Sequence, residues 1–434
     1  MNPTVVGIIA FLVMMLLIIL KCPIYMAMLI CSFGGLMAIA SPSMVATQFV
    51  GSPFSTTANY GYAIVPLFTF LGLLTEKTGI AEGAFQAAQT WLNRSRGGLL
   101  KTVVVANGIF GACSGTPTTG TVVFSRMALP ALRKSGYGDS TSLGCIASAA
   151  CLASIIPPSS MIITNCMLTN NSISYSLMCG VGAGILTIVV FFLVIDGIAI
   201  FRPKEIPPRE KEKTPLKLKL KALTLLIPIF ALFAIIIIGS YVGFFTATVG
   251  GAFGAFVCLV YAAVKRIGWK ELFKAARDAA IINAGFFPLM IAGLLFGRFV
   301  ALTQIPNTLM NWILTLHAPT IVIFTVIMIF YIICGMLMDM VPVSLITVPI
   351  LYPVLVGLGF NPNCIVILLV FISSMGGITP PIGLGVFMTS LTTGVDSSKI
   401  FKGVWPYFFV LLISAYLIAF IPQICTFLPD LLAR

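Results

Sequence analysis

The sequence has few charged residues and little of what soluble proteins place on their surfaces. Only 9% of its 434 residues are charged, and the mean hydropathy is +1.10. This composition excludes a water-soluble enzyme or a nucleic-acid-binding protein. Acidic residues number 12 against 25 lysines and arginines. Such an excess is typical of a membrane protein that retains basic residues in its cytoplasmic loops.

Several catalytic classes lack the residues they need. The only histidine, His317, lies on an amphipathic stretch, so the sequence predicts neither a Ser–His pair nor a histidine metal site. No G-x-x-x-x-G-K-[ST] loop is present for ATP. None of the eleven cysteines belongs to a C-x-x-C motif, and they are predicted to be free thiols. We therefore expect no enzyme activity. Any transport should draw its energy from an ion gradient or from a partner.

Apolar runs of roughly 20 residues recur along the whole chain, the length of a membrane-spanning helix rather than of a barrel strand. The first run, from Val5 to Leu20, has no basic segment before it and no small-residue cleavage site after it. It is therefore predicted to be a membrane span and not a signal peptide. The sequence predicts an all-α polytopic membrane protein.

The chain contains an internal repeat with an offset of 223 residues. The pair Pro157-Pro158 recurs as Pro380-Pro381, and the same offset relates Pro130 to Pro353 and Gly136 to Gly359. The apolar segments follow the same offset. We predict a first repeat over 1–201, a basic cytoplasmic linker over 202–221 and a second repeat over 222–434.

Each repeat contains the same kinds of segment. Two Gly-rich stretches are too interrupted to be simple spans, and we predict re-entrant hairpins, which bilayers permit only against protein or a water-filled cavity. After each hairpin comes a helix that contains a proline pair. The proline pair is expected to break this helix, because proline lacks an N–H and clashes with the preceding turn. The predicted segments are scaffold helices at 4–40 and 225–264, hairpins at 98–134 and 321–357, and broken helices at 140–171 and 363–394.

The charge pattern favours opposite orientations for the two repeats. Five crossings per repeat is an odd number, which gives about ten crossings plus two hairpins and inverts the second repeat. With the N-terminus outside, 22 of the 25 basic residues fall inside, and only Arg434 falls outside. Arg126 and Arg298 lie within the membrane. This agreement with the positive-inside rule predicts inverted-topology repeats and places both termini outside.

The interrupted segments carry chemistry that suits secondary transport, because exposed helix ends attract anionic groups and freed carbonyls coordinate cations. The first tip offers hydroxyls and carbonyls around Thr116, and the offset places Asp339 at the same position in the second tip. Oxygen ligands favour a hard cation such as sodium. Asp339 is a functional candidate because a carboxylate in an apolar region needs a cation or hydrogen bonds; the alternative is a helix cap. Arg298 and Arg126 are candidates for carboxylate binding, or they snorkel or form structural ion pairs.

These residues resemble a known family, the large membrane (M) subunit of tripartite ATP-independent periplasmic (TRAP) transporters within the ion-transporter superfamily. The resemblance covers essentially the whole chain, and its final motif is the most specific. The motifs are Ser114-Gly115-Thr116, Pro130 to Tyr137, Ile156-Pro157-Pro158-Ser159, Asp339 followed by Val348-Pro349-Ile350, and Thr379-Pro380-Pro381-Ile382-Gly383-Leu384.

The resemblance implies sodium-coupled import of an organic acid, such as sialic acid or a C4-dicarboxylate, across the bacterial inner membrane by an elevator motion. It also implies two partners, a small four-helix membrane subunit (Q) and a periplasmic substrate-binding protein (P). Two alternatives remain open from the residues themselves. One is a stand-alone sodium- or proton-coupled organic-anion carrier without a binding protein, and the other is a channel.

The resemblance also assigns residues to sites. One sodium ion is expected at Ser114, Gly115, Thr116, Ser154, Ile155 and Pro157. A second is expected at Gly335, Met338, Asp339, Gly376, Gly377 and Thr379. The substrate is expected between the tips, in contact with Thr116, Pro158, Asp339, Pro381 and Arg298.

Overall fold

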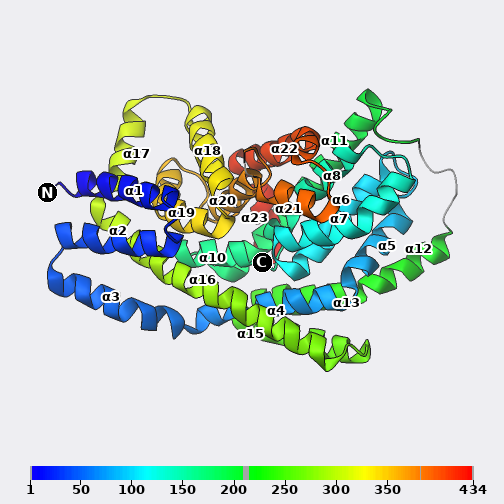
Figure 1. Cartoon of the computed structure of the whole chain (residues 1–434), viewed down its shortest axis with the longest axis horizontal. Helices are drawn as coiled ribbons and strands as arrows, with labels where there is room; N and C mark the ends of the chain where they lie inside the picture. Colours follow the sequence, from blue (N-terminus) through cyan, green and yellow to red (C-terminus); the bar gives the residue numbers. More distant parts are fainter. Residues whose placement is uncertain (1, 209–214, 382, 433–434) are drawn as a thin grey trace.

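The computed structural model describes residues 2–208, 215–381 and 383–432, and all the regular secondary structure of this part is helical (Figure 1). Residues 209–214 of the predicted linker, Ile382 of the last motif and Arg434 lie outside the described residues. Within them, six helices are long and apolar enough to cross a membrane, or eight if each of two bent helix pairs forms one span. The predicted all-α membrane protein is confirmed. The number of crossings and the orientation of the repeats stay predictions.

The described part of the first half forms eleven α-helices and one short 3₁₀ helix. They are α1 (Pro3–Ile19), α2 (Ile24–Ile39), α3 (Pro42–Thr57), η1 (Tyr60–Ala63), α4 (Ile64–Lys77), α5 (Ile80–Leu92), α6 (Gly98–Ser114), α7 (Pro117–Lys134), α8 (Asp139–Ala149), α9 (Leu152–Ile155), α10 (Ser160–Thr169) and α11 (Ile173–Phe201).

The described part of the second half begins with α12 (Leu216–Leu223) and a helix broken into η2 (Thr224–Leu226), α13 (Ile227–Phe233), η3 (Ala234–Ile238) and α14 (Gly239–Tyr241). The remaining helices are α15 (Ala247–Val264), α16 (Trp269–Thr303), α17 (Ile305–Thr315), α18 (Thr320–Leu337), α19 (Met340–Gly357), α20 (Pro362–Gly376), α21 (Leu384–Thr393), α22 (Ser397–Phe420) and α23 (Gln423–Leu432).

Helices of the two halves correspond at the 223-residue offset. The bounds of α7, shifted by 223, are those of α19, and the shifted bounds of α6 differ from those of α18 by one residue at the start. Packing follows the same correspondence, because α2 packs on α16 and its equivalent α15 packs on α4. In Figure 1, α1 and α2 lie at the left end of the molecule, and α13 and α15 lie along its lower edge from the middle towards the right.

The two halves differ where the sequence shows no long apolar run. In the first half α3 and α4 meet at a bend of 48°, whereas α16 is one continuous helix of 35 residues. Neither α3 nor the start of α16 was predicted, because both are too polar to read as spans. The start of α3 is fixed by Ser41, whose side chain accepts the Met44 N–H, and by Pro42 in the first turn. An ion pair of 3.3 Å between Lys77 and Glu271 joins α4 to the start of α16.

Most buried apolar side chains form one large core around α6, α8, α11, α20 and α22. A second, smaller core joins α1 and α2 to α16. At the base of the first helix pair, the Lys101 ammonium group is buried and lies 2.8 Å from both carboxylate oxygens of Asp196 on α11. The ten cysteines whose side chains the structure describes are free thiols.

Candidate functional site

The first tip is a two-residue break between α6 and α7. Gly115 has φ = +65°, a conformation that glycine adopts without strain, and its N–H donates to the Gly111 carbonyl over 2.8 Å. Thr116 is extended, and Pro117 starts α7, where its missing N–H costs nothing. The Ser114 hydroxyl oxygen is buried and has no hydrogen-bond partner among the described residues, so the tip has an oxygen available for a ligand.

The first proline pair lies against this tip. α9 ends at Ile155 and α10 begins at Ser160, with a cis peptide bond between Pro157 and Pro158 in the break. The Ser160 hydroxyl donates to the Gly115 carbonyl over 3.4 Å. Two interrupted segments that are distant in sequence therefore meet at their breaks.

The second tip joins α18 to α19 through Met338 and Asp339. Asp339 is the residue before α19, and its side chain does not make the usual N-cap hydrogen bond with that helix; the backbone group of α19 that acts on its carboxylate is the Met340 N–H. Behind the tip the backbones of Gly335 and Gly376 touch, and a Cβ on Gly376 would lie 2.5 Å from the Cα of Gly335. Glycine is required here because any side chain would separate α18 from α20.

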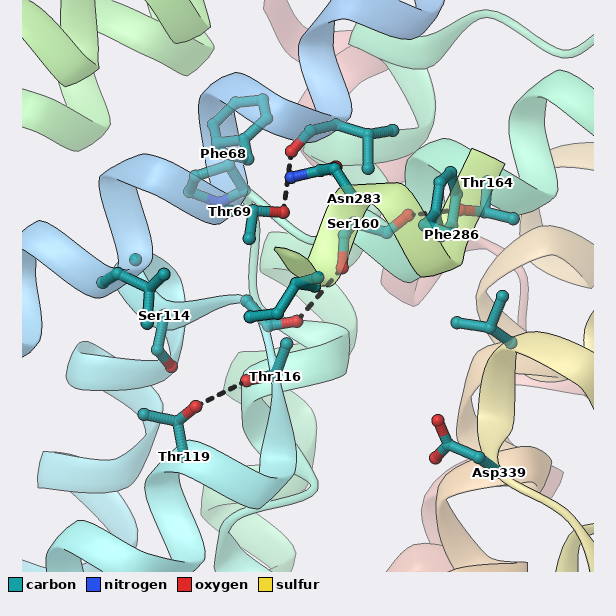
Figure 2. Close-up of a pocket in the computed structure, with 17 residues that line it drawn as sticks. Phe68, Thr69, Ser114, Thr116, Thr119, Ser160, Thr164, Asn283, Phe286 and Asp339 are labelled. Atoms are coloured by element: carbon teal, nitrogen blue, oxygen red, sulfur yellow. Dashed lines mark hydrogen bonds between the residues drawn. The ribbon is translucent and has the colours of Figure 1, made fainter. Parts of the chain in front are cut away.

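The two tips, α4, α10 and α16 enclose a cavity of about 210 Å³ (Figure 2). Among the described residues, Asp339 is the only charged one that lines it, and Figure 2 shows its carboxylate on the side opposite Thr116 and Thr119. The hydroxyl oxygens of Thr116 and Thr119 lie 2.8 Å apart. The cavity therefore has hydroxyl groups on one side and a single carboxylate on the other.

A smaller cavity of about 40 Å³ lies beside Asp339, between the two tips and the end of α20. It is lined by Met338, Gly377 and Ser374 from the second repeat and by Thr118 from the first tip. A volume of this size holds about one water molecule or a small ion. Asp339 lines both cavities and so lies between them.

The donors around these cavities suit a hard cation. They are hydroxyl, amide and carbonyl oxygens and one carboxylate, which hard cations prefer to nitrogen or sulfur. The Asn283 side-chain oxygen, like that of Ser114, is buried without a hydrogen-bond partner in the described part of the chain. No group of three or more His, Cys, Asp or Glu side chains that would suit a transition metal occurs among the described residues.

Some of the predicted site residues lie together at the cavities and others do not. Ser114, Gly115, Thr116, Pro158 and Asp339 line the larger cavity, and Met338, Asp339 and Gly377 line the smaller one. Gly335 and Gly376 contribute only their close backbone contact.

The remaining predicted residues lie behind the cavities or elsewhere. The Ser154 hydroxyl contacts that of Ser374, and Ile155 and Pro157 face Gly180 on α11. The Thr379 hydroxyl donates to the Met375 carbonyl over 2.5 Å. Pro381 and Arg298 are not among the residues that line the two tip cavities, and Arg298 lines a separate cavity.

Sequence reasoning did not predict the wall that faces the tips. Thr69 of α4 and Asn283 and Phe286 of α16 line the larger cavity (Figure 2). The available signal was Asn283, an amide within an apolar stretch of helix, where polar residues usually have a functional or packing role. Which helix lies opposite the tips depends on tertiary packing and cannot be read from spacing.

The chain belongs to a family of membrane transport subunits. Residues 11–424 match the model of the family described as "Tripartite ATP-independent periplasmic transporter, DctM component". The expected TRAP large membrane subunit is thereby confirmed.

The matches to individual relatives cover most of this chain and most of each relative. The chain is 28% identical to the C4-dicarboxylate TRAP transporter large permease protein DctM of Pseudomonas aeruginosa, over 87% of this chain and 88% of that protein. It is 26% identical to the ectoine permease TeaC of Halomonas elongata (85% and 86% covered) and to the sialic acid permease SiaM of Vibrio cholerae (86% and 87% covered).

Two solved transporters share the fold at low sequence identity. The Alcanivorax borkumensis YdaH transporter is 16% identical, with a TM-score of 0.54 and 85% of this chain and 87% of that chain covered. Neisseria gonorrhoeae MtrF is 12% identical, with a TM-score of 0.59 and 99% and 95% covered. These likenesses describe the fold alone.

Proposed function

We propose that this chain is the membrane permease of a sodium-driven importer for a solute that carries a carboxylate group. The observation that carries the proposal is Asp339, the single charged side chain that the described residues contribute to a cavity formed by the ends of two interrupted helix pairs. A lone carboxylate surrounded by hydroxyl and carbonyl oxygens is stabilised when a cation binds beside it. A bound cation in turn offsets the repulsion between Asp339 and an anionic solute, which couples the two binding events.

The solute class follows from what the named relatives handle. C4-dicarboxylates, ectoine and sialic acid differ in size and shape, but each carries a carboxylate. Figure 2 shows hydroxyl groups of Ser114, Thr116 and Thr119 on the first-tip side of the cavity, where they are placed to donate hydrogen bonds to such a group. The exposed N-terminus of α7 adds a favourable dipole.

We propose that the chain works in the bacterial inner membrane with a small membrane subunit and a periplasmic solute-binding protein. The tripartite family to which the chain belongs supports this assembly. We also propose that the helix pairs and broken helices move as one body past α1, α2, α4, α15 and α16. The membership of the chain in the tripartite family, for which an elevator motion is expected, supports this division.

Uptake into proteoliposomes tests the function. Labelled succinate, N-acetylneuraminate and ectoine are each offered under an inward sodium gradient, with the small subunit and the binding protein present or omitted. We expect uptake of one solute that requires sodium and both partners. Sodium-driven uptake by this chain alone would instead establish the stand-alone carrier, and ionic current far above carrier turnover would establish a channel. Absence of sodium-dependent uptake with all components and all three solutes would contradict the proposal.

A further inference from the structure

A second polar cavity, of about 560 Å³, lies further along α16 than the larger tip cavity. The larger tip cavity is lined by Asn283 and Phe286 of α16 and by the start of α10. The second cavity is lined by Gly297 and Arg298 of α16 and, at the end of α10, by Asn170. At 1.5 Å per residue, Asn283 and Arg298 are separated by about 22 Å along the helix. The two cavities therefore lie end to end between the same two helices.

One face of α16 lines both cavities. Its contributing positions include 283, 286, 293, 297 and 301, whose spacing is that of a single helical stripe. At the end of the second cavity nearest the first, this face packs closely on α19: a Cβ on Gly293 would lie 2.5 Å from the Leu345 side chain. Met290 at this level is fully buried. A narrow apolar contact thus separates the two polar spaces.

Of the residues that the structure describes, Arg298 is the only charged one that lines the second cavity. Its guanidinium group donates to the Gln48 side-chain oxygen and, over 2.8 Å, to the Ser52 hydroxyl, both on α3. No Asp or Glu of the described chain forms an ion pair with it. Both observed partners are neutral, so they hold the guanidinium in place without cancelling its charge.

The rest of the lining suits an anion. Tyr62 and Tyr352 bring phenol groups, and Asn170 brings an amide, from three separate elements. The Tyr352 hydroxyl accepts a hydrogen bond from the Asn171 amide over 2.8 Å, which leaves its own O–H free to donate. An oriented guanidinium beside O–H and N–H donors is an arrangement that binds carboxylates.

We propose that the Arg298 cavity is an anion-binding subsite that receives the carboxylate of the transported solute on the outer side of the tip cavity. The inference rests on the proposed function and on the predicted topology, in which the C-terminal half of α16 faces outward. Arg298 attracts the anion before it meets the cation-loaded site at Asp339. α3, which has no apolar run of span length, has a role here: it fixes the guanidinium through Gln48 and Ser52.

The charge in this cavity can be measured without transport, from the rates at which a thiol placed there reacts with an anionic and with a cationic reagent. Ala301 lines the cavity and is exposed, so Ala301→Cys introduces a reporter thiol, with the unsubstituted chain measuring reaction at the native cysteines. The probes are an anionic sulfonatoethyl and a cationic trimethylammonioethyl methanethiosulfonate. We expect Arg298→Gln to lower the anionic-to-cationic rate ratio by about tenfold, as expected for loss of one nearby charge. Arg298→Lys should retain most of the ratio.

The matched control is Arg126→Gln, because Arg126 is an exposed arginine on α7 that lines neither cavity. It should leave the ratio unchanged. Equal ratios in the parent and in Arg298→Gln would overturn the subsite, whether or not the protein transports any of the three solutes. If sodium-driven uptake is observed, Arg298→Gln should raise the KM about tenfold with little change in kcat; an unchanged KM would show that the anion bound there is not the solute.

Discussion

The hydroxyl oxygens of Ser154 and Ser374 lie 2.8 Å apart, and both side chains are fully buried. Ser154 belongs to the first repeat and Ser374 to the second. Beside them the Cys151 thiol lies 3.6 Å from the Ser374 carbonyl oxygen, and residues 151 and 374 are separated by the 223-residue offset. Equivalent positions of the two repeats therefore touch, as expected where an axis of approximate two-fold symmetry passes through a fold.

This serine pair should stabilise the contact between the repeats. Each hydroxyl also has a backbone acceptor, the Cys151 carbonyl for Ser154 and the Val370 carbonyl for Ser374. Ser154→Ala and Ser374→Ala should each lower the free energy of unfolding by about 1 kcal/mol, and the double variant should lose less than the sum, because the contact between the two hydroxyls is shared. Thermal unfolding in detergent measures this. Ser148→Ala is the control, since the buried Ser148 hydroxyl has no partner in the described part of the chain. Additive losses would show that the two hydroxyls are not coupled.

Asp339 should be needed for sodium coupling but not for folding. Asp339→Asn keeps the shape of the side chain and removes the charge that faces both tip cavities. We expect at least a tenfold fall in sodium-driven uptake, a changed sodium dependence and normal membrane insertion. Asp396→Asn is a matched control, because Asp396 also precedes a helix but only accepts a capping hydrogen bond from Ser398. Normal uptake with unchanged sodium dependence in Asp339→Asn would remove Asp339 from the site.

Thr379 should support the second tip through its bond to α20. Its hydroxyl donates to the Met375 carbonyl one turn back, at the end of α20 beside Gly376 and Gly377. Thr379→Ala should reduce uptake severalfold, because the backbone around the smaller cavity loses a constraint. Thr392→Ala removes an equivalent bond, to Met388 on α21, and should leave uptake near normal. The same loss in both variants would indicate a general effect of threonine removal.

The sequence was sufficient to predict much of the helical framework but not its packing. Each of the intervals 98–134 and 321–357 contains a helix pair, because glycine, proline and aspartate mark the breaks locally. The opposite wall of the cavity was not predictable, because Asn283 reaches the tips only through the packing of α16. The placement of Arg298 by α3 likewise depends on a contact over 246 residues to Ser52. Local breaks follow from backbone chemistry, whereas such distant contacts follow from how the helices pack.

The close contact between α16 and α19 should tolerate no side chain at Gly293. A Cβ there would lie 2.5 Å from the Cδ2 and 2.9 Å from the Cβ of Leu345. Gly293→Ala should therefore lower the thermal unfolding midpoint and uptake together, because overpacking costs about 1–3 kcal/mol. Gly285→Ala on the same helix meets nothing within 4 Å and should instead stabilise the protein by up to about 1 kcal/mol. Equal stability of the two variants would show that the contact yields without strain.

The ion pair between Lys101 and Asp196 should respond differently to the loss of each partner. The Lys101 side chain is 7% exposed and that of Asp196 is 42% exposed. Asp196→Asn leaves a buried, unpaired ammonium and should lower the free energy of unfolding by about 2 kcal/mol. This loss is smaller than is usual for a fully buried ion pair, because water reaches the Asp196 side of this one. Lys101→Met leaves a carboxylate that water already solvates, and it adds apolar packing beside Phe192, over whose ring the ammonium lies at 5.3 Å. We therefore expect Lys101→Met to be the milder change and the double variant to be more stable than Asp196→Asn alone. Unfolding of the three variants in detergent measures the order; a double variant less stable than Asp196→Asn would show that the ammonium is not destabilising when unpaired.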